Sequence, residues 1–564
     1  MKKTFKRLGA VLLAAFMLLS TTICALAVEG ADASATDKTI TLNVSGVADG
    51  DTVSAYKLVW YNTNGNGYEF DQSFEKYIKE TAKTEDAQTY LASLDTASVN
   101  KLLEGYAAKC NEKKPEYTLP SNPITSKSAT KNTAALEGLK PGYYLLLTST
   151  DTKNNRIYTP LSAFIQKDGN DLVVYAGANN SPLKAESDES YKVSAKAENG
   201  PTIDKKTNAT KGTNKTPEWM ETAAAGVGDT VRFYVAVTIP KYANVSALNL
   251  TVNDTLTNLK YEEGTAKVYT EKPVLNANGV TGTPETIDSA IKNTSTIAGD
   301  YNTETGKQNL TFELDYEKIM KGATQSRTVY VYYEAIMQKE AVTGTNHQGA
   351  NVATLTYSNA ANSDIEYTTD PKETDVFTYY IGLTKKKNTG NESLKGAYFS
   401  VYTAENSKTP LKFVEMTENG TKYYRLAVGD EADTVTQIEA DFQIRGLDAN
   451  TYYLEEVVAP QGYTKPSGRF EITMTSRMEN NKHTGTLDNT QSSIKTLNDA
   501  DKALILSSGV NVEKNYQFSI SLGNFSTPNL PTTGGTGTVL LSIGGVVLMA
   551  AGAYLLFFRK KKEN

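Results

Sequence analysis

The residues that most clearly indicate chemistry form a pentapeptide close to the C-terminus. They are Leu530, Pro531, Thr532, Thr533 and Gly534. The proline restricts the backbone, and the glycines behind it keep the stretch accessible, which is typical of a processing site. An apolar run follows at 539–558 and a basic cluster at 559–562. Since about twenty apolar residues can cross a bilayer and basic residues mark its cytoplasmic side, we expect this site just outside a membrane.

This order of features resembles the LPxTG cell-wall sorting signal of Gram-positive surface proteins. The resemblance implies that a sortase cysteine attacks the carbonyl group of Thr533 and releases everything from Gly534 onward. The acyl group then passes to an amine, either on peptidoglycan or on another subunit. The chain would be a sortase substrate, held in the membrane for a short time and then anchored to the cell wall.

The N-terminus and the composition predict an exported protein that is not an enzyme. Basic residues, the apolar run 8–19 and Ala25-Leu26-Ala27 are typical of a secretory signal peptide at 1–27. The remaining cysteine, Cys110, cannot form an internal disulfide. The net charge of −6 argues against a nucleic-acid partner. His347 and His483 lack metal-ligand spacing, and two histidines offer few candidates for the base of a hydrolytic triad. We therefore expect no metal, no cofactor and no enzymatic activity.

A long exported chain without disulfides could be stabilised by isopeptide bonds between lysine and asparagine side chains. The lysine amine condenses with the asparagine amide and expels ammonia. The lysine must be neutral, which burial in apolar surroundings favours, because burial lowers its pKa. A nearby buried carboxyl group must shuttle protons, and all three groups must be held in contact.

One segment near the C-terminus resembles a motif linked to this chemistry. Residues 452–463 read Tyr-x-Leu-x-Glu-x-x-Ala-Pro-x-Gly-Tyr, which is similar to the E-box of Gram-positive pilins, with Val457 where threonine is usual. The resemblance implies that Glu456 is the promoting carboxyl group. It also implies that Lys385, on an opening strand, and Asn524, just upstream of the sorting motif, are the residues that it joins.

A second set of residues resembles the middle domain of the same pilin family. The segment 201–205 is similar to the family's opening strand, and Tyr357-Ser358-Asn359 is similar to its closing strand. Asp254 matches the acid of this type of domain. The resemblance therefore implies an isopeptide bond between Lys205 and Asn359, promoted by Asp254.

Two choices of lysine stay open. Neighbours on a strand point to opposite faces, so either Lys205 or Lys206 faces the core, and Lys205 is the first choice. The second choice concerns the lysine that links subunits. Shaft-forming pilins carry a Tyr-Pro-Lys-Asn-type motif at the end of domain one, whereas the segment 193–197 offers Lys196 without the proline or the asparagine. Lys184 is the second candidate.

The fold class we expect is mainly β, with three tandem Ig-like (Cna-type) β-sandwich domains, because period-two alternation between Gly and Asn turns recurs along the chain. The N-terminal domain covers 28–197, the middle domain 198–371 and the C-terminal domain 372–525. Residues 526–564 form the sorting signal with its transmembrane helix. Helical spacing predicts an insertion at 74–110 in the first domain.

Domains one and three share a Tyr-rich strand, at Tyr143-Tyr144 and Tyr452-Tyr453. They could be distant copies of one module. In this alignment Leu147 occupies the position of the E-box acid. We therefore expect no isopeptide bond in the first domain.

The resemblance extends over nearly all of the mature chain and implies a major pilin, a structural subunit that polymerises through Thr533 and a lysine of domain one. Other pilin subunits, sortase and peptidoglycan are then its partners. The alternative is a wall-anchored monomeric adhesin, or a tip or accessory pilin. Its helical insertion would bind a host or extracellular ligand, because inserted elements on a sandwich often carry binding.

Overall fold

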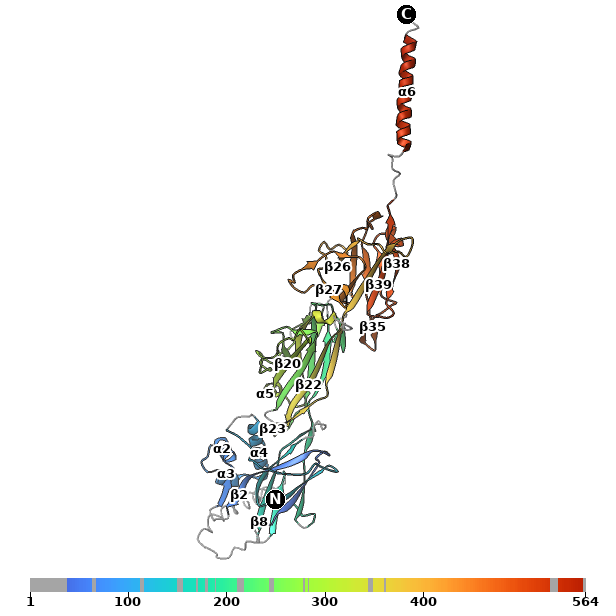
Figure 1. Cartoon of the computed structure of the whole chain (residues 1–564). Coiled ribbons are helices and arrows are strands. Elements are labelled where there is room, and N and C mark those ends of the chain that lie inside the picture. Colours follow the sequence, from blue (N-terminus) through green and yellow to red (C-terminus); the bar gives the residue numbers. More distant parts are fainter. Residues whose placement is uncertain are drawn as a thin grey trace. The chain divides into compact units, whose positions relative to one another are not determined.

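The computed structural model describes most of the chain between residues 38 and 560, and Figure 1 shows its course. The described ranges are 38–62, 67–111, 116–149, 156–168, 171–177, 181–187, 189–209, 218–242, 248–276, 279–282, 284–342, 348–359, 362–527 and 536–560. The predicted signal peptide at 1–27 and the pentapeptide at 530–534 lie outside them. The chain divides into two compact units, Met1–Thr378 with Ser476–Gly485, and Tyr379–Thr475 with Thr486–Asn564.

Two β-sheets form the first domain. Strand β1 (Ile40–Ser45) lies between β10 (Ser190–Ser194), to which it is parallel, and β5 (Thr133–Leu139), to which it is antiparallel. The larger sheet has the order β3-β2-β6-β8-β9, with β4 paired to β2. Its strands are β2 (Thr52–Asn62), β3 (Gly67–Phe70), β4 (Ile124–Thr125), β6 (Gly142–Ser149), β8 (Leu161–Asp168) and β9 (Asp171–Ala176). Leu42, Val53 and Leu146 belong to the core that the two sheets share.

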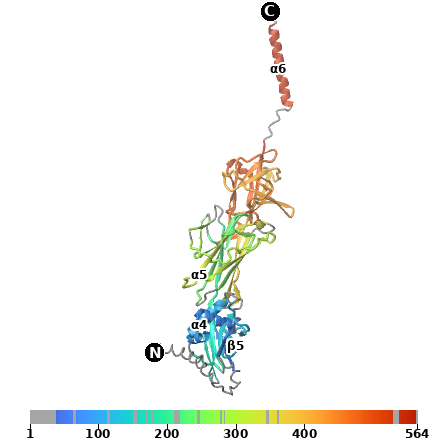
Figure 2. The same cartoon turned by 90° about the vertical axis from the view of Figure 1, so that its left-hand side faces the viewer.

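Three helices pack on the larger sheet of the first domain (Figures 1 and 2). They are α2 (Gln72–Ala82), α3 (Ala87–Ser93) and α4 (Thr96–Asn111). The carboxylates of Asp71 and Asp86 accept hydrogen bonds from backbone N–H groups at the starts of α2 and α3, as capping residues do. Leu103 of α4 packs in one core with Leu145 and Phe164 of the sheet. The predicted helical insertion at 74–110 is confirmed.

Two further sheets form the middle domain and share one core. Their orders are β12-β14-β21-β16, with β17 paired to β21, and β13-β24-β22-β15-β20, with β23 paired to β22. The first contains β12 (Thr202–Asn208), β14 (Thr230–Ile239), β16 (Leu259–Tyr261), β17 (Lys267–Tyr269) and β21 (Arg327–Met337). The second contains β13 (Thr222–Ala224), β15 (Asn249–Thr257), β20 (Lys307–Asp315), β22 (Gln348–Asn359), β23 (Asn362–Thr368) and β24 (Lys372–Phe377). The hairpin β18 (Val274–Asn276) and β19 (Gly279–Thr281), the helix α5 (Tyr316–Met320) and the 3-10 helix η2 (Lys339–Val342) complete it.

Alternation along these strands places charged groups inside the apolar core. Ile203 and Lys205 are buried on β12, and Val252, Asp254 and Leu256 are buried on β15, while the residues between them are not. Burying a charge is unfavourable unless it is paired or neutralised. The inward-facing lysine and aspartate therefore mark this core as a place to look for a site.

Two strands extend their domains beyond the boundaries expected from the sequence. β11 (Ala197–Asn199) pairs with β7 (Arg156–Tyr158), so the first domain continues past residue 197. β24 pairs with β22 and β13 of the middle domain, so that domain ends at Thr378 and not at 371. The residue pattern predicts one strand from Phe377 to Lys385, but the chain changes sheets at Thr378. Alternation alone does not reveal which neighbour a strand pairs with.

The third domain also consists of two sheets. Their orders are β29-β27-β28-β31-β25-β39-β33, with β38 paired to β39, and β30-β26-β32-β34-β37. The larger contains β25 (Tyr379–Lys387), β27 (Phe413–Glu418), β28 (Thr421–Leu426), β29 (Thr434–Val435), β31 (Phe442–Leu447), β33 (Tyr463–Thr464), β38 (Ile505–Val510) and β39 (Gln517–Ser526). The smaller contains β26 (Tyr398–Tyr402), β30 (Ile438–Glu439), β32 (Thr451–Val458), β34 (Phe470–Thr473) and β37 (Ser493–Thr496). The 3-10 helix η3 (Asp499–Leu504) completes it. The hairpin β35 (Ser476–Glu479) and β36 (Lys482–Leu487) follows β34 in the chain, but Ser476–Gly485 belongs to the compact unit that contains Met1–Thr378.

A final helix, α6 (Thr536–Lys560), contains the apolar run expected to form a membrane span. Among the helices of the described part of the chain, none combines the length and the apolarity that crossing a membrane requires. The prediction of a transmembrane segment at 539–558 therefore stays a prediction. The mainly β prediction for the chain as a whole is confirmed, since every domain is built on paired sheets.

Candidate functional site

The third domain brings Lys385, Glu456 and Asn524 together from three strands. β25 and β39 are parallel neighbours, with Lys385 opposite Leu522, so Asn524 lies two residues farther along on the same face. Glu456 comes from β32 in the other sheet, where it alternates inward with Tyr452 and Leu454. Lys385 is fully buried, and Glu456 and Asn524 are only 1% exposed. The first and last strands of the domain and the E-box strand thus meet at one buried point.

In this cluster the carboxylate of Glu456 contacts both nitrogen atoms. Lys385 Nζ donates to Glu456 Oε2 at 2.9 Å, to the backbone oxygen of Gly523 at 2.9 Å, and to Asn524 Oδ1. Asn524 Nδ2 donates to Glu456 Oε1 at 2.7 Å. The amine is therefore in contact with the side-chain amide, and the carboxylate spans the two.

Burial shifts the protonation of this pair toward its neutral form. Desolvation lowers the pKa of Lys385, against the opposing charge of Glu456. Desolvation also raises the pKa of Glu456, against the opposing charge of Lys385. A neutral amine beside a protonated carboxyl group is a nucleophile beside a proton donor. The cluster therefore has the groups that amide exchange requires, already in contact.

The middle domain holds a second buried cluster around Lys205. Its Nζ donates to Asp254 Oδ2 at 2.5 Å, and both side chains are fully buried. Burial lowers the pKa of Lys205, and the charge of Asp254 opposes this shift. Lys206 points outward instead, 23% exposed, toward Asp204 and Glu221. Of the two lysines considered from the sequence, Lys205 is the one inside the core.

The amide that lies in this cluster belongs to Asn351, and the assignment of Asn359 needs correction. Asp254 is opposite Ala353 in the register of β15 and β22, and Leu256, the next buried residue of β15, is opposite Asn351. Asn359 ends the strand six residues beyond Ala353, paired with Asn362. At about 3.3 Å per residue, that is about 20 Å away. Positions 351 and 359 are an even number of residues apart, so strand alternation read from the sequence does not distinguish the two asparagines. The cross-strand register shows which of them lies near Asp254.

Tyr333 of β21 completes the second cluster, and nothing in the sequence singled it out. Its hydroxyl group donates to Asp254 Oδ2 and accepts from Asn351 Nδ2 at 2.5 Å and from Lys205 Nζ at 3.3 Å. Asp254 Oδ1 and Asn351 Oδ1 are buried without a hydrogen-bond partner among the described residues. β21 reads Tyr-Val-Tyr-Tyr at 330–333, and this pattern gives no sign of which hydroxyl group reaches the core.

The two lysines proposed for subunit linkage both lie on the surface of the first domain. Lys196 is exposed between β10 and β11, and its backbone oxygen accepts from the N–H of Thr159. Lys184 is exposed in the segment between β9 and β10. Exposure makes both amines accessible and does not choose between them.

A shared turn relates the first and third domains. The hydroxyl group of Tyr144 donates to the backbone oxygen of Lys140 at 2.8 Å, and that of Tyr452 donates to the backbone oxygen of Asp448 at 3.2 Å. Each is a tyrosine corner, in which the hydroxyl group bonds four residues upstream. Counting from the corners, Thr148 and not Leu147 occupies the position of Glu456. The alignment of Tyr143-Tyr144 with Tyr452-Tyr453 was therefore wrong by one residue.

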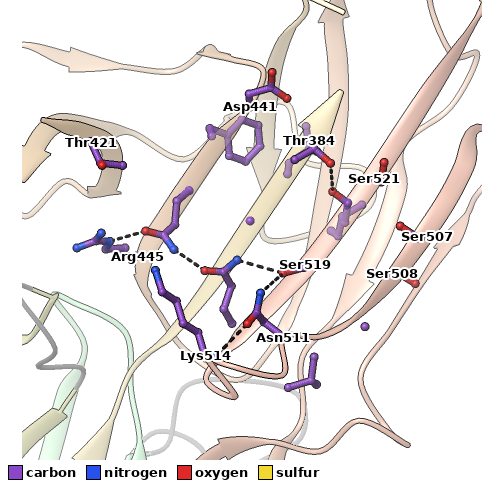
Figure 3. A pocket seen from close by; sticks show the side chains of 18 of the residues that line it. Thr384, Thr421, Asp441, Arg445, Ser507, Ser508, Asn511, Lys514, Ser519 and Ser521 are labelled. Carbon is purple, nitrogen blue, oxygen red and sulfur yellow. Dashed lines mark hydrogen bonds between the residues drawn. The ribbon is translucent and has the colours of Figure 1, made fainter. Parts of the chain in front are cut away.

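A polar groove of about 810 Å³ opens on the third domain (Figure 3). Lys386, the outward neighbour of Lys385, is among the residues that line it. Arg445 donates to Gln443, Gln443 to Gln517, and Gln517 to Ser519, as the dashed lines in Figure 3 show. Thr384 and Lys386 line the groove and Lys385 between them is buried in the core, so the groove lies on the opposite face of β25 from the candidate site.

Comparisons with known proteins place two parts of the chain in families. Residues 380–491 match the SpaA prealbumin-like fold domain, and residues 526–564 match the LPXTG cell wall anchor motif. The first range contains Lys385 and Glu456, and the second contains the pentapeptide. No curated protein matches the chain.

Several solved structures are similar along most of the chain. The T6 backbone pilin of serotype M6 Streptococcus pyogenes is 15% identical, covers 87% of this chain and 99% of its own, and has a TM-score of 0.45. The major pilin SpaD from Corynebacterium diphtheriae is 15% identical, with 87% and 98% covered and a TM-score of 0.42. The RrgB pilus protein from Streptococcus pneumoniae is 13% identical, with 88% and 100% covered and a TM-score of 0.42.

The two family matches fall on the parts of the chain that the sequence marked as most informative. The E-box strand lies in the matched third domain, and the pentapeptide lies in the matched anchor. The chain is a cell wall-anchored surface protein with an LPXTG anchor motif, and most of its third domain matches the SpaA prealbumin-like fold domain.

Proposed function

We propose that this protein is a structural subunit of a sortase-assembled pilus on a Gram-positive cell surface. Thr533 is joined to the next amine by sortase, and two intramolecular isopeptide bonds stabilise the subunit. The observation that carries the proposal is the buried contact of Lys385, Glu456 and Asn524 directly upstream of a cell-wall anchor. The chain is then a substrate of sortase, and the only bonds that its own residues promote are the intramolecular ones.

The chemistry follows from the contacts in the third domain. The nitrogen of Lys385 forms a bond to the amide carbon of Asn524, and the bond from that carbon to the amide nitrogen breaks. Glu456 accepts the proton that the amine loses and supplies one to the leaving nitrogen, which departs as ammonia. Each bond formed lowers the mass by one ammonia, about 17 Da. In the middle domain we propose the same reaction between Lys205 and Asn351, with Asp254 as the acid.

The position of the bond explains why it suits a fibre. Lys385 is on the first strand of the third domain and Asn524 is on the last, and these strands are adjacent. Tension enters a pilus subunit near one end of each domain and leaves near the other. A covalent bond between the first and last strands carries this tension without unfolding the sheet between them.

Peptide mapping of the full-length chain tests the two bonds. We expect cross-linked peptides that join Lys385 to Asn524 and Lys205 to Asn351, each one ammonia lighter than its two components. The substitution K385A removes the first cross-link, and K386A, which changes the outward neighbour, leaves it intact. Unmodified peptides at all four positions in the wild-type chain would contradict the proposal.

Polymerisation needs its own experiment, because a wall-anchored adhesin would also carry the anchor and the bonds. Cell-wall extracts separated on denaturing gels should show a ladder of covalent multimers. The ladder should disappear with K196A, our first candidate for the linking lysine, or with K184A, the second. A single band of monomer would favour the alternative, an adhesin or tip subunit that uses helices α2–α4 to bind a host or extracellular ligand.

A further inference from the structure

Tyr333 lies between the two nitrogen atoms that would react in the middle domain. Its hydroxyl group accepts from Asn351 Nδ2 at 2.5 Å and from Lys205 Nζ at 3.3 Å, and it donates to Asp254 Oδ2. The side chain is fully buried. Its ring stacks on Phe233 with centroids 5.4 Å apart and packs against Phe312 at 5.3 Å. The aromatic neighbours therefore fix the position of the hydroxyl group.

The third domain shows what this hydroxyl group replaces. There, one oxygen of Glu456 holds the amine and the other holds the amide nitrogen. Asp254 is one methylene shorter, and its Oδ1 has no hydrogen-bond partner among the described residues. The amide nitrogen of Asn351 bonds to Tyr333 instead. A carboxylate and a phenol together thus make the contacts that one glutamate makes in the other cluster.

We propose that Tyr333 is a catalytic residue of the middle domain that relays a proton from Asp254 to the leaving nitrogen of Asn351. This inference rests on the proposed bond between Lys205 and Asn351. As the nitrogen of Lys205 bonds to the amide carbon, it gives a proton to Asp254 Oδ2. Asp254 passes a proton to the Tyr333 oxygen while Tyr333 gives its own to the amide nitrogen. The carbon–nitrogen bond of Asn351 breaks, ammonia leaves, and both relay groups regain their starting protonation.

The electrostatics of the core suit a phenol in this role. Burial foremost, and then the charge of Asp254, holds the pKa of Tyr333 well above its ordinary value. The hydroxyl group therefore keeps its proton at neutral pH and can donate it. Since it returns to the same state after the transfer, a single hydroxyl group is enough for the step.

The rate of cross-linking in Y333F tests the proposal. The full-length chain is made by cell-free translation, stopped with denaturant at intervals and digested, and both cross-linked peptides are quantified by mass spectrometry. We expect Y333F to slow formation of the Lys205–Asn351 bond by about a hundred-fold or more, the lower end of what a positioned proton donor contributes. The Lys385–Asn524 bond of the same molecules should form at the wild-type rate.

The matched control is Y332F. Tyr332 neighbours Tyr333 on β21, and its hydroxyl group donates to Glu334 and not into the cluster. Y332F should cross-link at the wild-type rate. Equal rates in Y333F and Y332F would overturn the role of Tyr333 while leaving the bond itself established. Absence of the Lys205–Asn351 peptide from the wild-type chain would instead contradict the proposed bond.

A double variant decides the matter if Y333F does not fold, as judged by protease resistance of the middle domain. In D254E/Y333F the longer carboxylate can span the amine and the amide, as Glu456 does. Recovery of the Lys205–Asn351 cross-link in this variant supports the proton relay, because a purely structural tyrosine would not be replaced by a longer acid. Continued absence of the cross-link in the double variant overturns the proposal.

Discussion

In the third domain one carboxylate contacts both the amine and the amide, whereas in the middle domain a carboxylate and a phenol divide these contacts. Glu456 bonds to Lys385 and to Asn524 through its two oxygen atoms. Asp254 bonds to Lys205 and to Tyr333, and Tyr333 bonds to Asn351. Glutamate is one methylene group longer than aspartate, and this length determines whether one side chain or two are needed to contact both the amine and the amide. A search for a lysine, an acid and an asparagine therefore describes the third domain fully and the middle domain only in part.

The two clusters also differ in how much chain they enclose. The pair Lys385 and Asn524 joins β25 to β39, the first and last strands of the third domain. The pair Lys205 and Asn351 joins β12 to β22, so β23 and β24 lie outside the loop that the bond would close. The third domain would be closed along its whole length. The middle domain would keep a segment at its C-terminal end, β23 and β24, that no cross-link protects from unfolding under tension.

The largest effect should follow from E456A in the third domain. We expect the Lys385–Asn524 cross-link to disappear and the free energy of unfolding to fall by about 5 kcal/mol, the scale of a lost cross-link over a loop this long. Peptide mapping and denaturant unfolding measure the two effects. E455A is the control, since Glu455 pairs with Arg469 at 3.0 Å near the surface. Loss of the cross-link in E455A as well would count against a specific role for Glu456.

The next prediction separates the two asparagines of the middle domain. N351A should abolish the cross-link to Lys205, because Asn351 carries the amide that contacts the cluster. N359A should leave the cross-link complete, because Asn359 ends the strand about 20 Å away. Mass spectrometry of the digested chains shows which peptide is joined. A cross-link that survives N351A and is lost in N359A would reverse our correction.

A third prediction uses force to compare the enclosed loops. Pulled from both ends, the middle domain should lengthen by about 9 nm at most, the extended length of residues 352–378. The third domain should lengthen much less, since its cross-link encloses nearly all of it. Single-molecule force spectroscopy of the wild-type chain and of K205A makes the comparison. K205A should add a step of about 50 nm, and an identical trace would show that no bond protects the middle domain.

The smallest effect concerns pH in a third domain that cannot react. In N524A, Lys385 and Glu456 remain free to titrate. Burial raises the pKa of Glu456 above its ordinary 4.5, so the folded state binds the proton more tightly than the unfolded state. Stability is therefore greatest below pH 4.5 and falls as the pH rises through the raised pKa. The total loss is about 1.4 kcal/mol for each pH unit by which the folded-state pKa exceeds the unfolded-state pKa.

Denaturant unfolding of N524A between pH 4 and pH 8 measures this slope. The control is N524A/E456Q, in which the amide does not titrate and the decline should be absent. Lys385 contributes in the opposite sense, since burial lowers its pKa and stability then rises with pH toward 10.5. Equal slopes in the two variants below pH 8 would mean that Glu456 is not the group responsible.

The sequence predicted more of the third domain than of the middle one. Lys385, Glu456 and Asn524 can all be assigned from the sequence, because the E-box has many fixed positions and Asn524 is tied to the sorting motif by distance along the chain. The opening strand and Asp254 in the middle domain matched shorter patterns, which fit more than one asparagine. The short patterns indicated Lys205 and Asp254, which both lie in the core, but they did not indicate Asn351.

The sequence by itself determined the β-sheet class, the helical insertion and the inward faces of the strands, since these depend on periodicity and residue type within a few neighbouring positions. Only the tertiary structure decided which strands pair and in what register. That register placed Asn351 beside Asp254, moved the end of the middle domain to Thr378 and brought Tyr333 into the cluster. Contacts between residues a hundred positions apart depend on how sheets stack, and no local pattern records that.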